Sequence, residues 1–439
     1  MSDANAALRD LLAAGSAPVP KLFKGGTHRC VPPEDTVRRV SPLFDMMGIT
    51  RVADVTGLDH IGIPVVVVSR PNSRSLSVSQ GKGVDLPAAR ASAVMESVEA
   101  WHAERIAAPV KLATYEELRW SHTLADVTAL PADAGSGFHP HLDLLWTESW
   151  DLLGQTPTWV PYELVHTRFT LPRPTGAGCF LASSNGLASG NHVIEAVIHG
   201  ICEVVERDAT TLWHLLDPDA AAATRVDLAT VRNPDARTVL DLYERAGVDV
   251  AVWETTTADI GVPSFFCVIT EGDDPFHRMH SAAGMGCHPV RTVALLRALT
   301  EAAQSRLTVT AGSREDVARD DYDRVRNPDV LARERALLRG RHARSFDSGP
   351  GFDADTFDAD LAWLLERLKN AGITQVLAVD LTLPHLRIPV VRVVIPGLES
   401  ASMLDGWVPG PRARALRGGV AGPPPVASDH ACDSEGSAR

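Results

Sequence analysis

Three segments of the chain repeat one spacing of polar and acidic residues. In each, a polar residue is followed by a glutamate four positions later and by a glutamate or glutamine three positions after that. The three sets are Ser92, Glu96 and Glu99; His199, Glu203 and Glu206; and Arg297, Glu301 and Gln304. At about 100° per residue, such positions fall within roughly 60° of one helix face. The spacing therefore predicts three helices, each with one narrow acidic or amide stripe.

The second of these segments, NHVIEAVIHGICEVVERDATTLWHLL, begins at Asn191 and is otherwise mostly apolar. Asn191 and Glu195 fall on the same side of the predicted helix as Glu203 and Glu206, and the segment contains no lysine. A solvated helix face is normally wide and charged, unlike this stripe. Carboxylates clustered among apolar residues repel one another and take up protons unless cations neutralise them. We therefore interpret the three stripes as parts of one cation site.

The chemistry of these side chains favours a particular cation. Carboxylate and amide oxygens, without a cluster of histidine and cysteine, suit a hard ion such as Mg²⁺, which commonly binds phosphate oxygens as well. The loop SSNGLASGN at 183–191 places two glycines before the second helix, with Asn191 as the predicted N-cap. Free backbone N–H groups at such a helix start attract phosphate, although the chain has no Walker A sequence. The residues thus favour a site for Mg²⁺ and a nucleotide.

Composition excludes several other classes of function. The formal net charge is −13, which argues against nucleic acid or an anionic membrane as the main partner. The six cysteines form no CxxC pair, so reduced thiols are expected rather than a disulfide framework or a zinc site. The N-terminus lacks the basic region of a signal peptide, and no stretch approaches the ~20 apolar residues that span a bilayer. We expect a cytoplasmic protein.

The chain divides into three parts by composition. Residues 1–20 are predicted to be a flexible arm or short helix, 21–408 one large domain, and 409–439 a Pro/Gly-rich disordered tail. Strands are expected within 48–79, at 248–255 and at 263–270, and a helix from about 290 to 308. Near the end of the domain a further helix and two strands complete the core, whereas the charged stretch 313–345 is expected to be a solvated surface insertion. The fold class is mixed α/β (α+β).

Three segments together resemble the ATP-binding segments of the YcaO family. They are GKGVDLPAARASAVMESVEAWHAE, SNGLASGNHVIEAVIHGICEVVERDA and GCHPVRTVALLRALTEAAQSRLT, and the resemblance runs from about Gly26 to Glu399. It implies the YcaO fold, in which β-sheets pack against helices and the repeated helix motif converges on a Mg-ATP site. One departure is Ala100, where many relatives have arginine.

The resemblance implies an activity, cofactors and site residues. YcaO enzymes use ATP and Mg²⁺ to activate a backbone amide of a peptide, and they form azolines, thioamides or macrocyclic amidines. The residues implied in catalysis are Arg207, Glu203 and Glu206. Those implied in cofactor binding are Arg29, Ser92, Glu96, Asn191, Glu195, Arg207, Arg297, Gln304 and Arg306. Those implied as metal ligands are Glu96, Glu99, Glu195, Glu203, Glu206 and Glu301.

Within the family, the segments around 48–83 and IPVVRVVIPGLE look most like members encoded with a TfuA partner, which install thioamides. The PPP at 423–425 lacks the Pro-x-Pro-x-Pro spacing of azoline-forming members. Phosphorylation of an amide oxygen in a ribosomal peptide or protein, leading to a thioamide, is therefore expected. An azoline-forming cyclodehydratase, an amidine-forming enzyme and a non-catalytic ATP-binding scaffold remain alternatives. Expected partners are a precursor peptide or protein, a TfuA-like or E1-like protein and a second copy of the chain as a homodimer.

Overall fold

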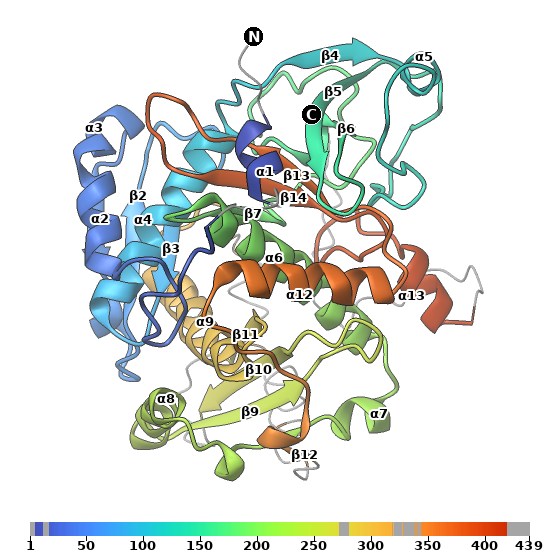
Figure 1. The fold of residues 1–439 in the computed structure, drawn as a ribbon. Helices are drawn as coiled ribbons and strands as arrows, with labels where there is room; N and C mark the ends of the chain where they lie inside the picture. The colour runs from blue at the N-terminus through green and yellow to red at the C-terminus, as the bar shows by residue number, and fades with distance from the viewer. Residues whose placement is uncertain are drawn as a thin grey trace.

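The computed structural model describes residues 5–11, 17–271, 281–317 and 344–418, together with the single residues 319, 327, 338 and 340. Three antiparallel sheets and three long helices form the framework of this part (Figure 1). The predicted mixed α/β class is confirmed. Among the described helices, none combines the length and apolar character needed to cross a membrane.

The largest sheet joins the middle of the chain to its C-terminal part. Its strand order is β4-β5-β13-β14-β7, with β6 paired to β5, and all its pairs are antiparallel. The strands are β4 Val110–Ala113, β5 Leu144–Asp151, β6 Thr156–Pro161, β7 Leu187–Ser189, β13 Leu377–Asp380 and β14 Val390–Val394. Successive residues of β14 belong to two different cores, because side chains alternate across a strand. The sheet therefore lies between the two main hydrophobic clusters of the protein.

Two smaller antiparallel sheets flank this one. The first contains β1 Arg51–Asp54, β2 Val65–Ser69 and β3 Val78–Lys82, and the second contains β9 Val248–Glu254, β10 Ser264–Glu271 and β11 Ala282–Cys287. A short parallel pair joins β8 Val226–Asp227 to β12 Arg344–Ser345. The strands expected at 248–255 and 263–270 are β9 and β10, so both predictions are confirmed to within one residue.

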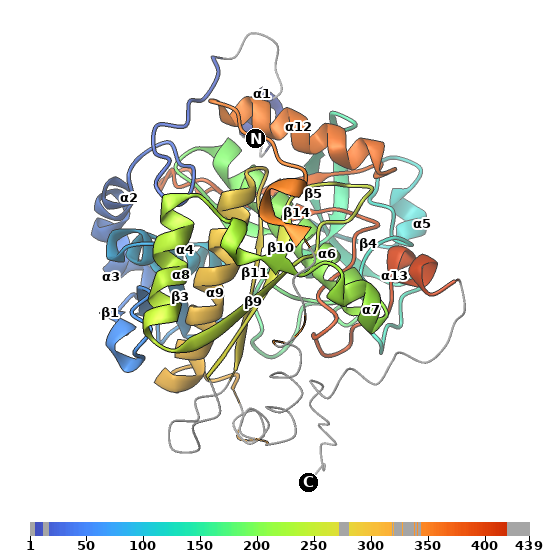
Figure 2. The ribbon, with the colours of Figure 1, turned by 90° about the horizontal axis from the view of Figure 1, so that it is seen from below.

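Each of the three predicted acidic helices directly follows a strand of a different sheet. Helix α4 (Leu86–Ala103) follows β3, α6 (Val193–His214) follows β7, and α9 (Arg291–Ala311) follows β11. Helix α9 packs against β11 and against α8 (Pro234–Arg245), as Figure 2 shows. The repeat seen in the sequence is thus a repeat of strand–helix units, and these units bring the three stripes to one place.

Glycine permits two of these strand–helix contacts. A Cβ atom on Gly81 of β3 would lie 2.0 Å from the Ala93 nitrogen of α4. A Cβ atom on Gly284 of β11 would lie 2.3 Å from the Ala298 oxygen of α9. No side chain fits at such distances, so the backbones of strand and helix touch directly.

The other helices of the described residues are α1 Ala6–Leu11, α2 Pro33–Val40, α3 Phe44–Met47, α5 Tyr115–Leu118, α7 Pro218–Ala222, α12 Phe357–Asn370 and α13 Pro411–Leu416. Of these, α2 packs against α4, and α1, α12 and α13 pack against α6. Short 3-10 turns include η2 at Thr56–Leu58 and η3 at Tyr162–Leu164. Helices α12 and α6 lie side by side (Figure 1) and share one apolar core.

Each of the two predicted terminal parts contains a helix that packs on the domain. The N-terminal arm contains helix α1, whose Leu8 is fully buried in the core it shares with α6 and α12. At the other end, α13 begins after the predicted boundary at 408, and its Arg412 forms ion pairs with Asp208 (3.0 Å) and Asp259 (2.6 Å). Apolar burial and ion pairs therefore attach α1 and α13 to the domain. Residues 419–439 and most of 318–343 lie outside the described residues.

The close contact at Gly81 leads to a prediction about stability. Gly81→Ala should destabilise the protein by about 1–3 kcal/mol or more, because overpacking a backbone contact forces strand and helix apart. The measurement is urea unfolding followed by circular dichroism. Gly57→Ala is the control, since a Cβ there meets no atom within 4 Å. Equal unfolding midpoints for the Gly81→Ala protein and the unsubstituted protein would contradict the direct backbone contact.

Candidate active site

A cavity of about 740 Å³ lies where the three strand–helix units meet. Helices α4, α6 and α9 all contribute side chains to its wall, and so do the segment before α2 and the turn between β2 and β3. The sequence-predicted residues that line it are Arg29, Ser92, Glu96, Glu99, Asn191, Glu203, Glu206, Arg207, Arg297, Glu301 and Gln304. The convergence of the three stripes, which spacing alone could only suggest, is thus a feature of the fold.

The acidic side chains of this cavity are poorly solvated. Desolvation raises the pKa of Glu99 to about 8 and that of Glu206 to about 7. Glu96 faces the open cavity, yet desolvation by the surrounding protein raises its pKa to about 7, against the opposing charge of Lys82. The pKa of Glu203 is raised for the same reason. Without an added cation, several of these carboxyl groups hold protons near neutral pH.

Two of the carboxylates already have a basic partner. Lys82 Nζ lies 2.6 Å from Glu301 Oε2, and Arg207 Nη1 lies 3.4 Å from Glu206 Oε1. Desolvation opposes ionisation of Glu301, but the charges of Lys82 and Arg207 outweigh it and lower its pKa. These pairs tie β3 to α9 and hold the Arg207 side chain at the cavity wall.

The other three carboxylates of the cavity are not paired with a basic side chain of the described residues. Within the described part of the chain, Glu96, Glu99 and Glu203 form no ion pair with a basic side chain. Glu99 instead accepts hydrogen bonds from Ser189 N (2.8 Å) and Ser189 Oγ (2.6 Å), which orient it from β7. Carboxylate oxygens are ligands that Mg²⁺ prefers, although within the described part of the chain no group of three or more His, Cys, Asp or Glu side chains is placed to hold a metal ion by itself. In nucleotide sites Mg²⁺ commonly takes one or two carboxylates and completes its coordination with phosphate oxygens and water.

The same cavity holds the basic groups that a polyphosphate needs. Arg29, Lys82, Arg207 and Arg297 all line it. Arg29 donates from Nη1 to the His28 carbonyl (2.9 Å), and desolvation lowers its pKa. Guanidinium groups form strong charge-assisted hydrogen bonds to phosphate oxygens. The wall therefore combines cation ligands with phosphate ligands, which is the pairing that a metal–nucleotide complex requires.

Glu195 does not lie where the sequence placed it. It is 2% exposed and does not line the cavity. Its two oxygens accept from backbone N–H groups, Oε2 from Asn191 and His192 and Oε1 from Cys30. His192, rather than Asn191, is the N-cap of α6, and Glu195 closes a capping box with it. In this structure Glu195 caps the backbone, because position N3 points back to the helix start, and its role as a metal and cofactor ligand stays a prediction.

Arg306 also lies outside the cavity. Its side chain is completely buried and pairs with Asp59 (Nε to Oδ2, 3.0 Å) and with Glu271. It follows Gln304 by two residues, which turns it by about 200° around the helix. The prediction of Arg306 as a cofactor ligand is therefore wrong in this geometry, and the residue instead joins α9 to η2 and to the end of β10.

Several cavity residues were not singled out from the sequence. Lys82 belongs to the GKGVDLP start of the first segment that resembles the family, and its place just before the first acidic helix was the available signal. Arg314 and Asp316 line the cavity as well, so the start of the segment expected to be a surface insertion belongs to the site. Thr308 also lines it, with no local pattern that could have identified it, whereas Ser183, Ser184, Ser189 and Gly190 of the predicted loop 183–191 line it as expected of that loop.

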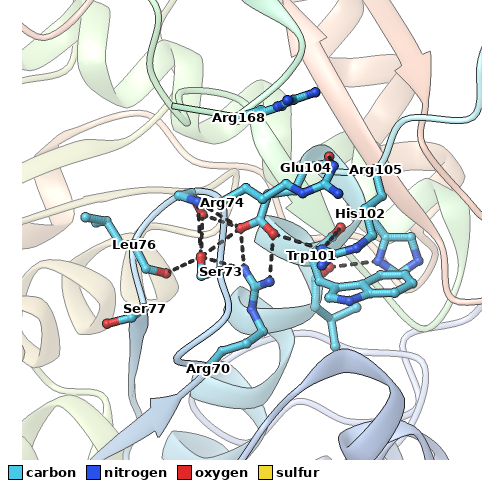
Figure 3. Close-up of polar contacts among 12 residues, drawn as sticks. Arg70, Ser73, Arg74, Leu76, Ser77, Trp101, His102, Glu104, Arg105 and Arg168 are labelled. Atoms are coloured by element: carbon cyan, nitrogen blue, oxygen red, sulfur yellow. Dashed lines mark hydrogen bonds and ion pairs between the residues drawn. The ribbon is translucent and has the colours of Figure 1, made fainter. Parts of the chain in front are cut away.

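A network of polar contacts surrounds the buried Glu104 (Figure 3) and holds a turn that lines the cavity. Glu104 accepts hydrogen bonds from Arg70 Nη1 (2.7 Å), Ser73 Oγ (2.8 Å) and Ser75 Oγ (2.6 Å). Burial opposes ionisation of Glu104, but the bonds from Arg70 and Ser75 outweigh it and lower its pKa to about 2. Ser75 and Leu76 of this turn line the cavity. The end of α4 therefore holds the turn that faces the acidic part of the same helix.

The comparisons with known proteins agree with this arrangement. Residues 80–399 match the family model described as YcaO cyclodehydratase, ATP- and Mg²⁺-binding. A protein encoded in the tfuA 3′ region of Rhizobium leguminosarum bv. trifolii is 39% identical over 379 residues, which cover 84% of this chain and 88% of that relative.

Two solved structures have a similar fold. A heterocyclase in complex with substrate and cofactor has a TM-score of 0.74 and 23% identity, and the match covers 94% of this chain and 58% of the heterocyclase. YcaO from Methanopyrus kandleri, bound with AMPPCP and Mg²⁺, has a TM-score of 0.68 and 23% identity, with 90% of this chain and 98% of that chain covered. The chain thus spans somewhat more than half of the heterocyclase and nearly all of the second protein.

The raised pKa values predict proton release on ligand binding. At pH 7, Glu99 and part of Glu96 are protonated in the free protein, and a bound cation must displace those protons because it favours the ionised form. Calorimetric titration of a preformed Mg²⁺ complex of a non-hydrolysable ATP analogue, in two buffers of different ionisation enthalpy, measures the release. It should decrease in the Glu99→Gln protein and vanish at a pH well above both values. A binding enthalpy that is the same in both buffers at pH 7 would contradict protonated carboxylates in the free site.

Proposed function

Since the chain belongs to the YcaO family of ATP- and Mg²⁺-dependent enzymes that modify peptides, we propose that it phosphorylates a backbone amide oxygen of a ribosomal peptide or protein and installs a thioamide there. The observation that carries the choice of product is the relative at 39% identity encoded in the tfuA 3′ region. The long sequence match to this relative supports a common reaction and a TfuA-like partner protein.

ATP and Mg²⁺ are the cofactors of this family, and the cavity fits them in the chemistry of its donors. Bound ATP supplies the phosphoryl group with which the amide oxygen departs as phosphate, while a sulfide donor supplies the sulfur that takes its place. The residues proposed to hold Mg²⁺ are Glu96, Glu99 and Glu203, which have no basic partner among the described residues. Those proposed to contact the nucleotide are Arg29, Ser92, Asn191, Arg297 and Gln304.

The two ion pairs of the cavity have a different proposed role. Glu206 holds the Arg207 guanidinium 3.4 Å away, and Glu301 holds Lys82 at 2.6 Å. Arg207 also donates to Met285 Sδ at 3.2 Å, so its position is fixed from two sides. A guanidinium held in this way stabilises negative charge that develops on transferred phosphate oxygens without reorganising during the reaction. In this proposal Arg207 is the catalytic cation, and Glu206 positions it.

A cyclodehydratase is the second candidate, and the description of the matching family model favours it. In that reaction a Cys, Ser or Thr side chain of the substrate replaces the external sulfur donor, and the phosphorylated amide oxygen again leaves. An ATP-binding scaffold without catalysis is disfavoured by the match to a family of enzymes, whereas the desolvated carboxylates support cation binding in either case.

The choice of product predicts a mass change in a cellular protein. In the native host, one peptide should carry the mass increase of sulfur replacing oxygen, and deletion of this gene should abolish it because the amide is no longer activated. Mass spectrometry of digested total protein from both strains is the measurement. Complementation with the original gene should restore the modified peptide, and complementation with the Glu203→Gln gene should not. Loss of one water from the modified peptide, in place of the sulfur increase, would establish the cyclodehydratase instead.

Glu203→Gln tests the activity of the purified protein. The substitution should lower ATP turnover by on the order of 100-fold, since a proposed ligand of the bound cation loses its charge. Circular dichroism should show an unchanged fold, because Glu203 faces the cavity and forms no ion pair within the described structure. Glu244→Gln, on the exposed surface of α8, is the control and should turn over ATP at the unsubstituted rate. Undiminished turnover in Glu203→Gln would exclude this residue from the catalytic site.

A further inference from the structure

The segment Val19–Cys30, here called the N-terminal strap, forms one wall of the cavity. It runs between α1 and α2 and passes the start of α12 (Figure 1), where Pro20 forms a bridge with Thr356. Phe23, Gly25, Gly26, Thr27 and Arg29 of the strap line the cavity. Because the strap has no regular helix or strand of its own, its position depends on what holds it at each end.

The upstream end is attached to the start of α12 by a buried ion pair. Lys21 Nζ lies 2.7 Å from Asp360 Oδ2, and both side chains have 0% exposure. Two further hydrogen bonds support the pair: Val19 N donates to Asp358 Oδ2 (2.6 Å), and Lys21 N donates to the Asp355 carbonyl (3.0 Å). A buried ion pair is weak evidence for stability, because apolar residues in its place often stabilise a protein equally well. The ion pair instead determines which residue of the strap contacts α12.

The downstream end is attached to the start of α6. Cys30 N donates to Glu195 Oε1, and the same carboxylate closes the capping box of α6. Between the two ends, Phe23 and Arg29 exchange two backbone hydrogen bonds of 3.0 and 2.9 Å, which close a small loop. Gly26 has a φ of +66°, and a Cβ atom there would lie 2.7 Å from Val84 Cγ2, so this loop fits closely against the turn before α4. The strap is therefore a closed loop between two fixed helix starts.

The charged residue of this loop that lines the cavity is Arg29. Its Nη1 donates to the His28 carbonyl, and among the described residues it forms no ion pair. The other N–H groups of the guanidinium have no hydrogen bond to a described acceptor. An arginine with spare donors beside Glu99 in a desolvated wall is suited to bind a phosphate group. Its usefulness depends on the register of the loop that carries it.

We propose that the buried pair of Lys21 and Asp360 positions Arg29 for nucleotide binding, by fixing the register of the N-terminal strap against α12. Lys21 and Asp360 are then positioning residues that act through Arg29 and do not touch the ligand. This inference depends on ATP binding by the family and not on whether the product is a thioamide or an azoline. A failure of the proposed thioamide reaction would leave it intact.

The first experiment measures the affinity of the full-length protein for a non-hydrolysable ATP analogue with Mg²⁺ by calorimetry. Lys21→Met should weaken binding by about tenfold or more, as changes in residues that orient a ligand typically do. The matched control is Lys24→Met on the same strap, whose pair with Asp355 spans 3.0 Å but is exposed. Lys24 does not line the cavity, and its substitution should change the affinity by less than twofold. Equal affinities for Lys21→Met and the unsubstituted protein would overturn the proposal.

A double-mutant cycle tests whether the effect passes through Arg29. In an Arg29→Ala background, Lys21→Met should cause no further loss of affinity beyond about twofold, because coupled residues are not additive. An equal loss in both backgrounds would show a general structural effect and would overturn the positioning role.

A second variant keeps the test decisive if the lone buried charge in Lys21→Met unfolds the protein. The combined Lys21→Met and Asp360→Leu protein contains no unpaired charge and should fold, as thermal unfolding without ligand can verify. Its affinity for the ATP analogue should stay reduced, because apolar contact does not fix the register of the strap. Affinity equal to that of the unsubstituted protein would show that the ion pair is dispensable and the proposal wrong.

Discussion

Repulsion among desolvated carboxylates is the constraint on which the rest of this structure depends. Glu96, Glu99, Glu203, Glu206 and Glu301 all line one cavity, and desolvation opposes ionisation of each of them. Two of the five are balanced by Lys82 and Arg207 from within the protein. In the proposed function the others would acquire their counter-charge from a bound cation, which would let an acidic protein bind an anionic nucleotide. The metal ion would neutralise the carboxylates and the phosphates at once.

Holding such groups together requires a rigid frame, and the three strand–helix units provide it. Direct backbone contact at Gly81 and Gly284 places α4 and α9 closer to their strands than side chains would allow. Charged groups outside the cavity then fix its walls: Glu104 holds the turn before β3, and Glu195 joins the start of α6 to the N-terminal strap. Glu104 and Glu195 are carboxylates like the residues of the site. They act indirectly, because their backbone and side-chain contacts hold the cavity wall and do not reach the ligand. Such support is what precise positioning of a reactive site demands.

Membership of the YcaO family establishes the cofactors and the general class of reaction, while the product depends on features beyond the ATP site. The cavity described here would serve thioamide and azoline formation equally, since both begin by activating an amide oxygen. What separates them is the nucleophile that arrives next. The segments that distinguish relatives within the family therefore carry more information about the product than the carboxylates of the ATP site do.

Much of the site could be predicted from the amino-acid sequence, because helical periodicity is local. The spacing of Glu96 and Glu99, of Glu203 and Glu206, and of Glu301 and Gln304 determined that each helix would carry one stripe, whatever its neighbours. Periodicity also marked β9 and β10 and the mixed α/β class. Residues just off a stripe were harder to place: Arg306 is two positions beyond Gln304, and the rotation of the helix turns it into a buried cluster with Asp59 and Glu271.

Other features were decided by tertiary structure alone. Glu195 has the spacing of a ligand, but position N3 of a helix lets its carboxylate reach back to the backbone, and the strap supplies Cys30 as a third donor. Lys82 and Glu301 are far apart in the chain and meet only because β3 and α9 pack side by side. The same holds for Lys21 and Asp360. The sequence specified which polar side chains lie on one face of each helix or strand. Long-range packing decided which of them share a cavity. The reason is that desolvation and charge pairing depend on distances between elements, and no local pattern contains those distances.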